Sequence, residues 1–397
     1  MHILMIAPEP FFEPRGTPFS EYHRLRALSS MGHTVDFVTY PFGEDREIPG
    51  VKIIRTAKPP FVSRVKIGPS WAKVPLDIAL AYTTLRVGLA GRYDAVHSHE
   101  EGGAIGVVMS WLLGVPHLYD MHSSLPQQIS NFGHANQRWM ARAFDWLERL
   151  MLRRSKVVIV ICPQLEEVVR LVNTTVPVVL IENAMGSGDA PTPGSGAVVR
   201  AALGMGPDTP MVLYTGTFEA YQGFDLLFGA MPAVIAARPE AKFVLMGGDH
   251  DQVRAAQARV DALGMSKNVL LTGQRPVGEV PAYLDAADAL VSPRSLGTNT
   301  PLKIYQYLRS GRPIVATRLI THTQVLDDET SILTAPEPAA YAAGILAAIS
   351  DRTRAREIGA RAKAMADVKY SEAAYLSKTR EAMRILAARE PIAEREP

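Results

Sequence analysis

Short apolar runs alternate with longer amphipathic segments along this chain, and the alternation stops once and then starts again. The strand-like runs of the first half are residues 2–7, 34–40, 95–97, 117–121, 156–161 and 178–181. Those of the second half are residues 211–215, 242–246, 268–271, 289–291 and 313–316. Apolar residues recur at helical spacing between them, as at 19–31, 105–113 and 135–153. Apolar strands separated by helices favour parallel sheets covered on both faces, so the sequence predicts an α/β chain with two doubly wound sheets.

The interruption is the stretch "GSGDAPTPGSGA" at 186–197, which is rich in small residues and offers little to bury. A chain of 397 residues is also long for a single core. We therefore predict an N-terminal Rossmann-like domain at 1–185, a linker or loop at 186–205 and a second Rossmann-like domain at 206–368. Residues 369–397 are predicted to form a C-terminal helix followed by a polar tail.

Composition excludes several classes of protein. The formal net charge of +2 gives no overall case for nucleic-acid binding. The single cysteine, Cys162, rules out an internal disulfide and suits a reducing compartment. The N-terminus is broken early by proline, unlike a signal peptide, and no apolar stretch approaches the ~20 residues that span a bilayer. These features predict a cytoplasmic protein that is soluble or peripheral on the inner face of the membrane.

In doubly wound sheets, ligands bind at the carboxyl ends of the strands, so the loops there are the candidate sites. Gly16 precedes the first predicted helix, and Gly216 and Gly247 follow two strands of the second half. Together they suit a phosphate-bearing ligand, because glycine lets backbone N–H groups approach an anion at the start of a helix. The dinucleotide fingerprint G-x-G-x-x-G is missing from the first loop, which disfavours a hydride-transfer enzyme.

Titratable side chains also follow two strands of the first half, namely His99, Glu100, Asp120 and His122. Their spacing matches no standard metal motif, so we predict no metal site. His122 is the strongest candidate among them, since it follows directly the end of an apolar strand.

A polar loop at 297–300 leads through Pro301 into a short predicted helix. Proline is well placed at such a start, where free backbone N–H groups can bind hydroxyl or phosphate oxygens. Lys303 adds a positive charge just inside the helix. We expect this loop to contact the ligand.

The order and spacing of these pieces resemble the retaining glycosyltransferases of family 4, which have the GT-B fold. The matching segments are "DAVHSH" (94–99), "LYTGTFEAYQGFDLL" (213–227), "FVLMGGD" (243–249), "NVLLTGQRPVGEVPAYLDAADALVSP" (268–293) and "YQYLRSGRPIVAT" (305–317). The resemblance implies two Rossmann-like domains facing a cleft, with the C-terminal helix returning to brace the first domain. It further implies that the second domain binds a nucleotide-sugar.

Four positions depart from the family pattern. Family members carry two glutamates eight positions apart, where this chain has Thr298 and Gln306. They also carry an arginine and a lysine that hold the donor diphosphate, where this chain has Thr217 and Gln222. Arg294 and Lys303 are nearby cations, and we expect them to compensate for the missing arginine and lysine. The catalytic residues predicted on this basis are His122, Lys303 and Arg294, and the donor-binding residues are Gly16, Gly216, Thr217, Gln222, Gly247, Thr298, Asn299, Thr300, Pro301, Leu302 and Gln306.

The resemblance implies a retaining hexosyltransferase that takes a sugar from a nucleotide diphosphate sugar, with UDP-sugars favoured, and passes it to a glycan or lipid-linked acceptor. No metal and no cofactor is expected. Two alternatives stay open. One is a non-catalytic or weakly active nucleotide-sugar-binding homologue, which the four departures motivate. The other is a GT-B-fold sugar-nucleotide epimerase, for which Glu100, Asp120 and His122 would supply the acid–base groups.

Basic and aromatic residues are interleaved at 58–75 and again at 136–156, which predicts contact with an anionic membrane surface. The first segment contains Lys58, Phe61 and Lys73, and the second contains Arg142 and Trp146. The alternative is that the apolar residues of the second segment form the buried face of a helix and that the first is a solvated loop.

Overall fold

The structure is a computed structural model that describes residues 1–12, 16–62, 65, 73–126, 138–182 and 191–388. The chain divides into two compact units. Unit 1 comprises Met1–Asn183 together with Tyr375–Pro397, and unit 2 comprises Ala184–Ala374. The C-terminal helix α15 (Glu372–Ala387) therefore contributes to the unit that contains the N-terminus.

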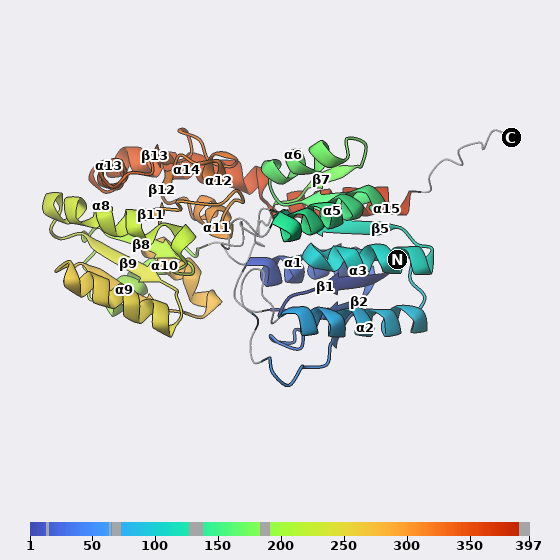
Figure 1. The fold of residues 1–397 in the computed structure, drawn as a ribbon. Helices are drawn as coiled ribbons and strands as arrows, with labels where there is room; N and C mark the ends of the chain where they lie inside the picture. Colours follow the sequence, from blue (N-terminus) through green and yellow to red (C-terminus); the bar gives the residue numbers. More distant parts are fainter. Residues whose placement is uncertain (13–15, 63–64, 66–72, 127–137, 183–190, 389–397) are drawn as a thin grey trace. The chain divides into compact units, whose positions relative to one another are not determined.

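Unit 1 is built on a seven-stranded sheet in the order β3-β2-β1-β4-β5-β6-β7, in which every pairing is parallel (Figure 1). Its strands are β1 (His2–Ala7), β2 (Thr34–Thr39), β3 (Val51–Arg55), β4 (Ala95–His99), β5 (His117–Met121), β6 (Val157–Val160) and β7 (Val178–Leu180). Its helices besides α15 are α1 (Gly16–Ser30), α2 (Val74–Ala90), the 3-10 turn η2 (Glu100–Gly102), α3 (Gly103–Leu113), α5 (Arg138–Arg154) and α6 (Pro163–Val172).

Side chains of β1 show how both faces of this sheet are buried. Ile3 and Met5 point into a core with α1 and α15, whereas Leu4 and Ile6 point into a core with α2 and α3. Since successive strand residues face opposite sides, a strand covered on both sides must be apolar throughout, as β1 is. A third cluster continues the second layer under α5 and α6.

Unit 2 has a six-stranded parallel sheet in the order β10-β9-β8-β11-β12-β13. Its strands are β8 (Met211–Thr215), β9 (Lys242–Met246), β10 (Val269–Gly273), β11 (Ala289–Ser292), β12 (Ile314–Thr317) and β13 (Ile332–Thr334). One face packs against α8 (Phe224–Ala237) and α13 (Pro338–Ser350), and the other against α10 (Val280–Ala286), α11 (Leu302–Ser310) and α14 (Arg352–Lys369). The remaining helical segments are α7 (Gly196–Ala202), η4 (Ala220–Gln222), α9 (His250–Ala262), η5 (Val277–Glu279) and α12 (Ile320–Thr323).

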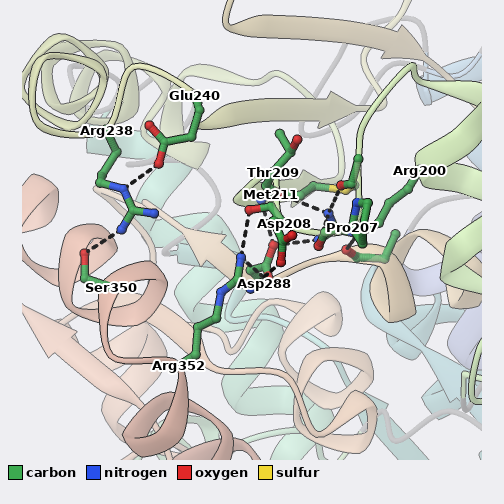
Figure 2. A network of polar contacts seen from close by, with 12 residues as sticks. Arg200, Pro207, Asp208, Thr209, Met211, Arg238, Glu240, Asp288, Ser350 and Arg352 are labelled. Carbon is green, nitrogen blue, oxygen red and sulfur yellow. Dashed lines mark hydrogen bonds and ion pairs between the residues drawn. The ribbon is translucent and has the colours of Figure 1, made fainter.

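The stretch predicted as a linker, 186–205, contains α7, and an arginine of α7 anchors it to unit 2. Arg200 donates to the carbonyls of Ala286 and Thr209 at 2.8 Å and to a carboxylate oxygen of Asp288 at 2.6 Å. The same oxygen accepts from the backbone N–H of Met211 at 2.9 Å, so the network ties α7 to the start of β8 (Figure 2). Residues 186–190 of the predicted linker lie outside the described residues.

The α/β prediction with two doubly wound sheets is confirmed by these two sheets. The strands β3 and β13 were not predicted, and each lies at an edge of its sheet. None of the helices in the described ranges is both long enough and apolar enough to pass through a lipid bilayer.

Candidate functional site

The loops after β8 and β9 meet backbone to backbone at the carboxyl edge of the sheet in unit 2. Gly216 donates its N–H to the carbonyl of Met246 at 3.0 Å, and Gly247 donates to Gly273 at 2.8 Å. A Cβ on Gly247 would lie 1.9 Å from the carbonyl oxygen of Gly216, and both glycines have left-handed φ values, 118° and 133°. Only glycine fits there, which leaves the backbone of Gly216 exposed.

Lys303 points its ammonium group at this exposed backbone. Its Nζ lies 3.8 Å from the centroid of the Tyr214 ring and 3.1 Å from where a Cβ of Gly216 would be. The side chain is buried, and its Nζ has no hydrogen-bond partner in the described part of the chain. Burial, with a smaller contribution from the charge of Arg294, holds the pKa of Lys303 well below its usual range. A buried amine of this kind is costly unless an anion joins it.

Two further buried polar atoms in the same region have no partner within the described residues. They are Oγ1 of Thr300, in the loop before α11, and Oε1 of Gln222, at the end of η4. Native proteins satisfy nearly all such atoms, and an unmet one next to a glycine cradle is typical of a ligand site.

Arg294 shapes the loop between β11 and α11. Its Nε donates to the carbonyl of Leu296 at 2.9 Å, its Nη1 donates to the carbonyl of Asn299 at 3.2 Å, and its guanidinium lies 5.1 Å from the Tyr221 ring centroid. Burial lowers the pKa of Arg294 from its ordinary value. Its side-chain hydrogen bonds are thus with the loop itself, and its ring contact is with Tyr221 of η4.

The short helix α12 and the residue that follows it also hold this loop by hydrogen bonds. Thr321 Oγ1 donates to the carbonyl of Asn299 and Gln324 Nε2 to the carbonyl of Thr298, both at 2.7 Å. His322 fixes α12 in turn, because its Nδ1 donates to the carbonyl of Thr317 at 2.9 Å and its Nε2 lies 2.8 Å from Ser292 Oγ. Burial lowers the pKa of His322 to about 3, so it is a neutral hydrogen-bonding residue.

The helix α11 begins at Leu302, with Pro301 as its N-cap and no side chain capping this end. Its first N–H groups therefore face the loop that carries Asn299 and Thr300. Gln306 lies half-buried one turn further along α11. The carbonyl of Thr217, in the loop after β8, accepts from the Tyr214 hydroxyl at 2.6 Å.

A second cluster of titratable side chains lies in unit 1, at the carboxyl ends of β4 and β5, with Asp120 at its centre. Arg24 Nε donates to Asp120 Oδ2 at 2.9 Å, and His122 Nε2 lies 3.3 Å from Asp120 Oδ1. His99 Nδ1 lies 3.2 Å from His122 Nε2, and His97 Nε2 lies 3.4 Å from Asp120 Oδ2. All five side chains are buried.

Charge pairing decides the protonation of this cluster. Burial would raise the pKa of Asp120, but the Arg24 guanidinium and the nearby imidazoles of His122 and His99 hold it well below its usual range. Burial lowers the pKa of His97 and His99. His97, His99 and Asp120 each offer a ligand atom within 4.8 Å of the others, yet Arg24 already neutralises the carboxylate. The hydrogen-bonded ion pair with Arg24 thus already satisfies the charge of the Asp120 carboxylate.

Glu100, which directly follows β4, is a buried non-glycine residue with a left-handed φ of 45°. Ser123 donates to its carboxyl group at 2.8 Å, and burial raises the pKa of Glu100 well above its ordinary value. Strained backbone of this kind clusters at functional sites, so the edge formed by β4 and β5 is the candidate site of unit 1. Gly16 also belongs to unit 1, where it begins α1.

The structure therefore brings Gly216, Gly247, Lys303 and the loop before α11 together in unit 2, and it places His122 and Gly16 in unit 1. Sequence reasoning missed Arg24, Tyr214 and His322. Arg24 alone left a signal, because it lies one turn before Leu28 on the face of α1 that is buried.

Two families match most of the chain between them. Residues 209–351 match the family described as "Glycosyl transferases group 1", and residues 22–184 match the "Glycosyl transferase 4-like domain". A phosphatidyl-myo-inositol mannosyltransferase of Propionibacterium freudenreichii is 23% identical over 343 residues, which cover 84% of this chain and 81% of that protein. A D-inositol 3-phosphate glycosyltransferase of Segniliparus rotundus is 28% identical over 130 residues, which span only 32% of this chain and 29% of that protein.

The fold is also that of solved glycosyltransferase structures. HepE of Anabaena in complex with UDP-glucose superimposes with a TM-score of 0.77 at 17% identity, over 97% of this chain and 99% of that one. The two parallel sheets with interleaved helices, the matched families and this likeness agree. The chain belongs to the group 1 glycosyltransferases of family 4 and has their two-domain, Rossmann-like GT-B fold.

Proposed function

We propose that this protein transfers a sugar from a nucleotide diphosphate sugar to a glycan or lipid-linked acceptor. One observation carries the proposal, namely the buried ammonium of Lys303, which has no partner in the described residues and faces the exposed backbone of Gly216. A diphosphate placed there would satisfy Lys303 and the free N–H groups at the start of α11 together. The fold alone would not carry the proposal, because one fold serves many functions.

Lys303 also offers a physical explanation for two of the departures from the family pattern. This chain has Thr217 and Gln222 where relatives place the cations that hold the diphosphate. The Nζ of Lys303 reaches the same loop after β8 from α11 instead, 3.1 Å from the Cβ position of Gly216. In the proposal, the positive charge that stabilises the leaving diphosphate comes from α11 rather than from the loop after β8.

The chemistry we propose is retaining transfer without a metal. The acceptor oxygen bonds to the anomeric carbon on the face from which the diphosphate leaves, and the leaving diphosphate takes the acceptor's proton. Protein catalysis is then positioning and charge stabilisation. Lys303 and the start of α11 stabilise the leaving phosphate, the loop of Asn299 and Thr300 holds the donor sugar, and Gln306 holds the ribose. In unit 1, His122, whose imidazole lies against Asp120, is the catalytic residue we propose.

A UDP-hexose is the donor we favour, and the similar fold of HepE, solved with UDP-glucose, supports this choice. For the acceptor, the relative from Propionibacterium freudenreichii is named for phosphatidyl-myo-inositol, which supports a lipid-linked acceptor at the inner face of the membrane.

A panel of nucleotide-sugars, scored for both binding and donor hydrolysis, tests the proposal. We expect slow hydrolysis of one donor and a loss of about 1.5–3 kcal/mol in donor binding or transition-state stabilisation in Lys303→Ala. Lys363→Ala is the matched control, because Lys363 lies in the same unit, on α14, and is paired with Asp367 at the surface. Binding without turnover would instead favour the non-catalytic homologue, which the losses at Thr298 and Gln306 motivate, and an isomerised donor would favour an epimerase.

A further inference from the structure

The helix α2 is apolar on both of its sides. Leu76 and Leu80 are buried against the sheet. A second stripe at helical spacing points away from the sheet and is exposed, and it consists of Val74, Ile78, Tyr82, Leu85 and Leu89. Tyr82 is 69% exposed and Ile78 is 65% exposed. A surface helix needs only one apolar stripe to pack on its own domain, so the outer stripe has no role in the fold of unit 1.

The neighbouring helix α3 extends this stripe into a surface. Its outward residues Val108, Trp111 and Leu112 are exposed, Trp111 by 76%, and none of its 11 residues is charged. The two helices approach closely, since a Cβ on Gly88 of α2 would lie 2.3 Å from the Met109 side chain of α3. We name the outward apolar residues of both helices the α2–α3 face. Contiguous apolar surface of this kind marks an interaction site.

Apart from the Arg149–Asp145 pair, the exposed charges beside the α2–α3 face are positive. α5 lies next to α3 over the same sheet (Figure 1). In the part of α2, α3 and α5 whose side chains are described, the exposed charged residues are Arg86, Arg142, Arg149, Arg153 and Arg154. Asp145 is paired with Arg149 at 2.8 Å, and Glu148 is buried and accepts from the Leu125 N–H. Trp146, 64% exposed, lies among these arginines.

We infer that the α2–α3 face and the arginines of α5 bind the surface of an anionic lipid bilayer. Arginines attract anionic headgroups, aromatic rings settle at the headgroup level, and aliphatic side chains enter the edge of the acyl region. A second copy of the chain fits less well, because the exposed charges of these helices offer arginines and no free acid to pair with them.

This surface includes the predicted segment 136–156, through Arg142, Arg149 and Trp146 of α5, and adds the α2–α3 face. In the segment 58–75, Lys73 is paired with Glu101 at 2.8 Å and is largely buried, whereas Lys58 and Phe61 are exposed. Arg64, Lys66 and Trp71 of that segment lie outside the described residues. The inference does not rest on the donor chemistry of unit 2, since every residue of the surface belongs to unit 1.

Co-sedimentation of the full chain with phosphatidylcholine vesicles, with and without phosphatidylglycerol, at low and high salt, is the test. We expect binding to the anionic vesicles that salt weakens. Arg142→Gln/Arg153→Gln/Arg154→Gln should weaken it about a hundredfold at low salt, at roughly fivefold for each arginine. Ile78→Ser/Tyr82→Ser/Trp111→Ser should weaken it by at least about a hundredfold, with an unchanged melting temperature because these side chains are exposed.

Val198→Ser/Val368→Ser is the matched control, because both side chains are 74% exposed and lie in unit 2. It should bind vesicles like the parent chain. Light scattering on the same samples measures whether the chain dimerises, and so tests whether a second copy of the chain covers the α2–α3 face. Absence of binding to anionic vesicles at low salt, binding as strong as the parent's by either triple variant, or a dimer that the serine variant disperses would each overturn the inference.

Discussion

The buried ammonium group of Lys303 lowers the stability of the folded protein, and it leaves a positive charge available to bind an anion. The ammonium lies against the Tyr214 ring, 3.8 Å from the centroid, with no acid to neutralise it in the described residues. Removing a charged group from water without a partner costs more than the ring returns. Evolution retains such an arrangement where activity needs it, and stability is lost in exchange.

Lys303→Met should therefore stabilise the protein without ligand while it weakens donor binding. We expect a gain of about 1–3 kcal/mol at neutral pH, since an unsatisfied buried group costs at least that much. Thermal denaturation of the two proteins, with and without UDP, measures both effects. UDP should raise the melting temperature of the parent and leave that of the variant nearly unchanged.

The pH dependence of this gain has a definite sign. The unfolded chain keeps the lysine proton up to a pH near 10.5, whereas burial makes the folded chain release it at lower pH. Between these two values the unfolded state binds more protons, so the parent gains stability as pH rises. The advantage of Lys303→Met should thus shrink as pH rises toward 10.5. An advantage that grows with pH would contradict the assignment of Lys303 as a buried, unpaired base.

At the scale of elements, the loop between β11 and α11 is an arrangement of carbonyls fixed by its own Arg294 and by side chains at 321 and 324. Arg294, Thr321 and Gln324 each donate to a carbonyl of residues 296–299. Preorganised polar groups stabilise a transition state better than groups that must reorient. The geometry of the predicted donor loop therefore depends on α12, which contains no residue of the predicted site.

Thr321→Val should reduce donor turnover although Thr321 is not predicted to touch the donor. The change removes the 2.7 Å bond to the Asn299 carbonyl and leaves that oxygen without this donor. We expect a loss of about 1–2 kcal/mol in kcat/KM. Thr323→Val is the control, because the Thr323 hydroxyl is exposed and bonds only locally, to the carbonyl of Leu319 at 3.3 Å. Equal losses in both variants would show that α12 acts through stability alone.

The sequence predicted the strands with buried neighbours on both faces because those strands must be apolar throughout. β1, β5, β8 and β9 match their predicted ranges. The edge strand β3 has no fully buried residue, since Lys52 is exposed and the other four are half-buried, so it lacks the continuous apolar run that marked the inner strands. α2 was missed because its outer stripe is apolar as well, which removes the periodic contrast that marks a surface helix.

Site residues were predictable where local chemistry marks them. The glycines after β8 and β9 and the lysine inside α11 stand out in the sequence, and the structure places Lys303 beside Gly216. The pairing of Arg24 with Asp120, 96 positions apart in the chain, and of Arg24 with Thr379 could not be predicted. Such contacts depend on which elements the fold brings together, and local sequence patterns contain no information about these long-range contacts.

At the scale of the whole molecule, unit 1 is built from two distant parts of the chain. Tyr375, Met383 and Leu386 of α15 are buried in the core that β1 and α1 share. Thr379 accepts from Arg24 at 3.1 Å, and the Arg24 guanidinium lies 5.1 Å from the Tyr375 ring centroid. Without α15, one face of the sheet in unit 1 and the buried Arg24 would meet water.

Truncation after residue 374 should unfold unit 1 and leave unit 2 folded. Losing three large buried side chains removes about 5–9 kcal/mol, which is comparable with the whole stability of a typical domain. Calorimetry should show one transition where the full chain shows the melting of both units. Truncation after residue 388, which leaves α15 intact, is the control. A truncated protein that retains the transition of unit 1 would contradict the role given to α15.

The divided make-up of unit 1 has a consequence for synthesis on the ribosome. Residues 1–183 emerge first, but their core lacks α15 until the 191 residues of Ala184–Ala374 have followed. At about 5–20 residues per second, that delay is roughly 10–40 s. Unit 2 is contiguous and can fold as it emerges. The unit synthesised first is therefore completed last, and during the delay the apolar sheet face that α15 will cover is open to chaperones and to other nascent chains.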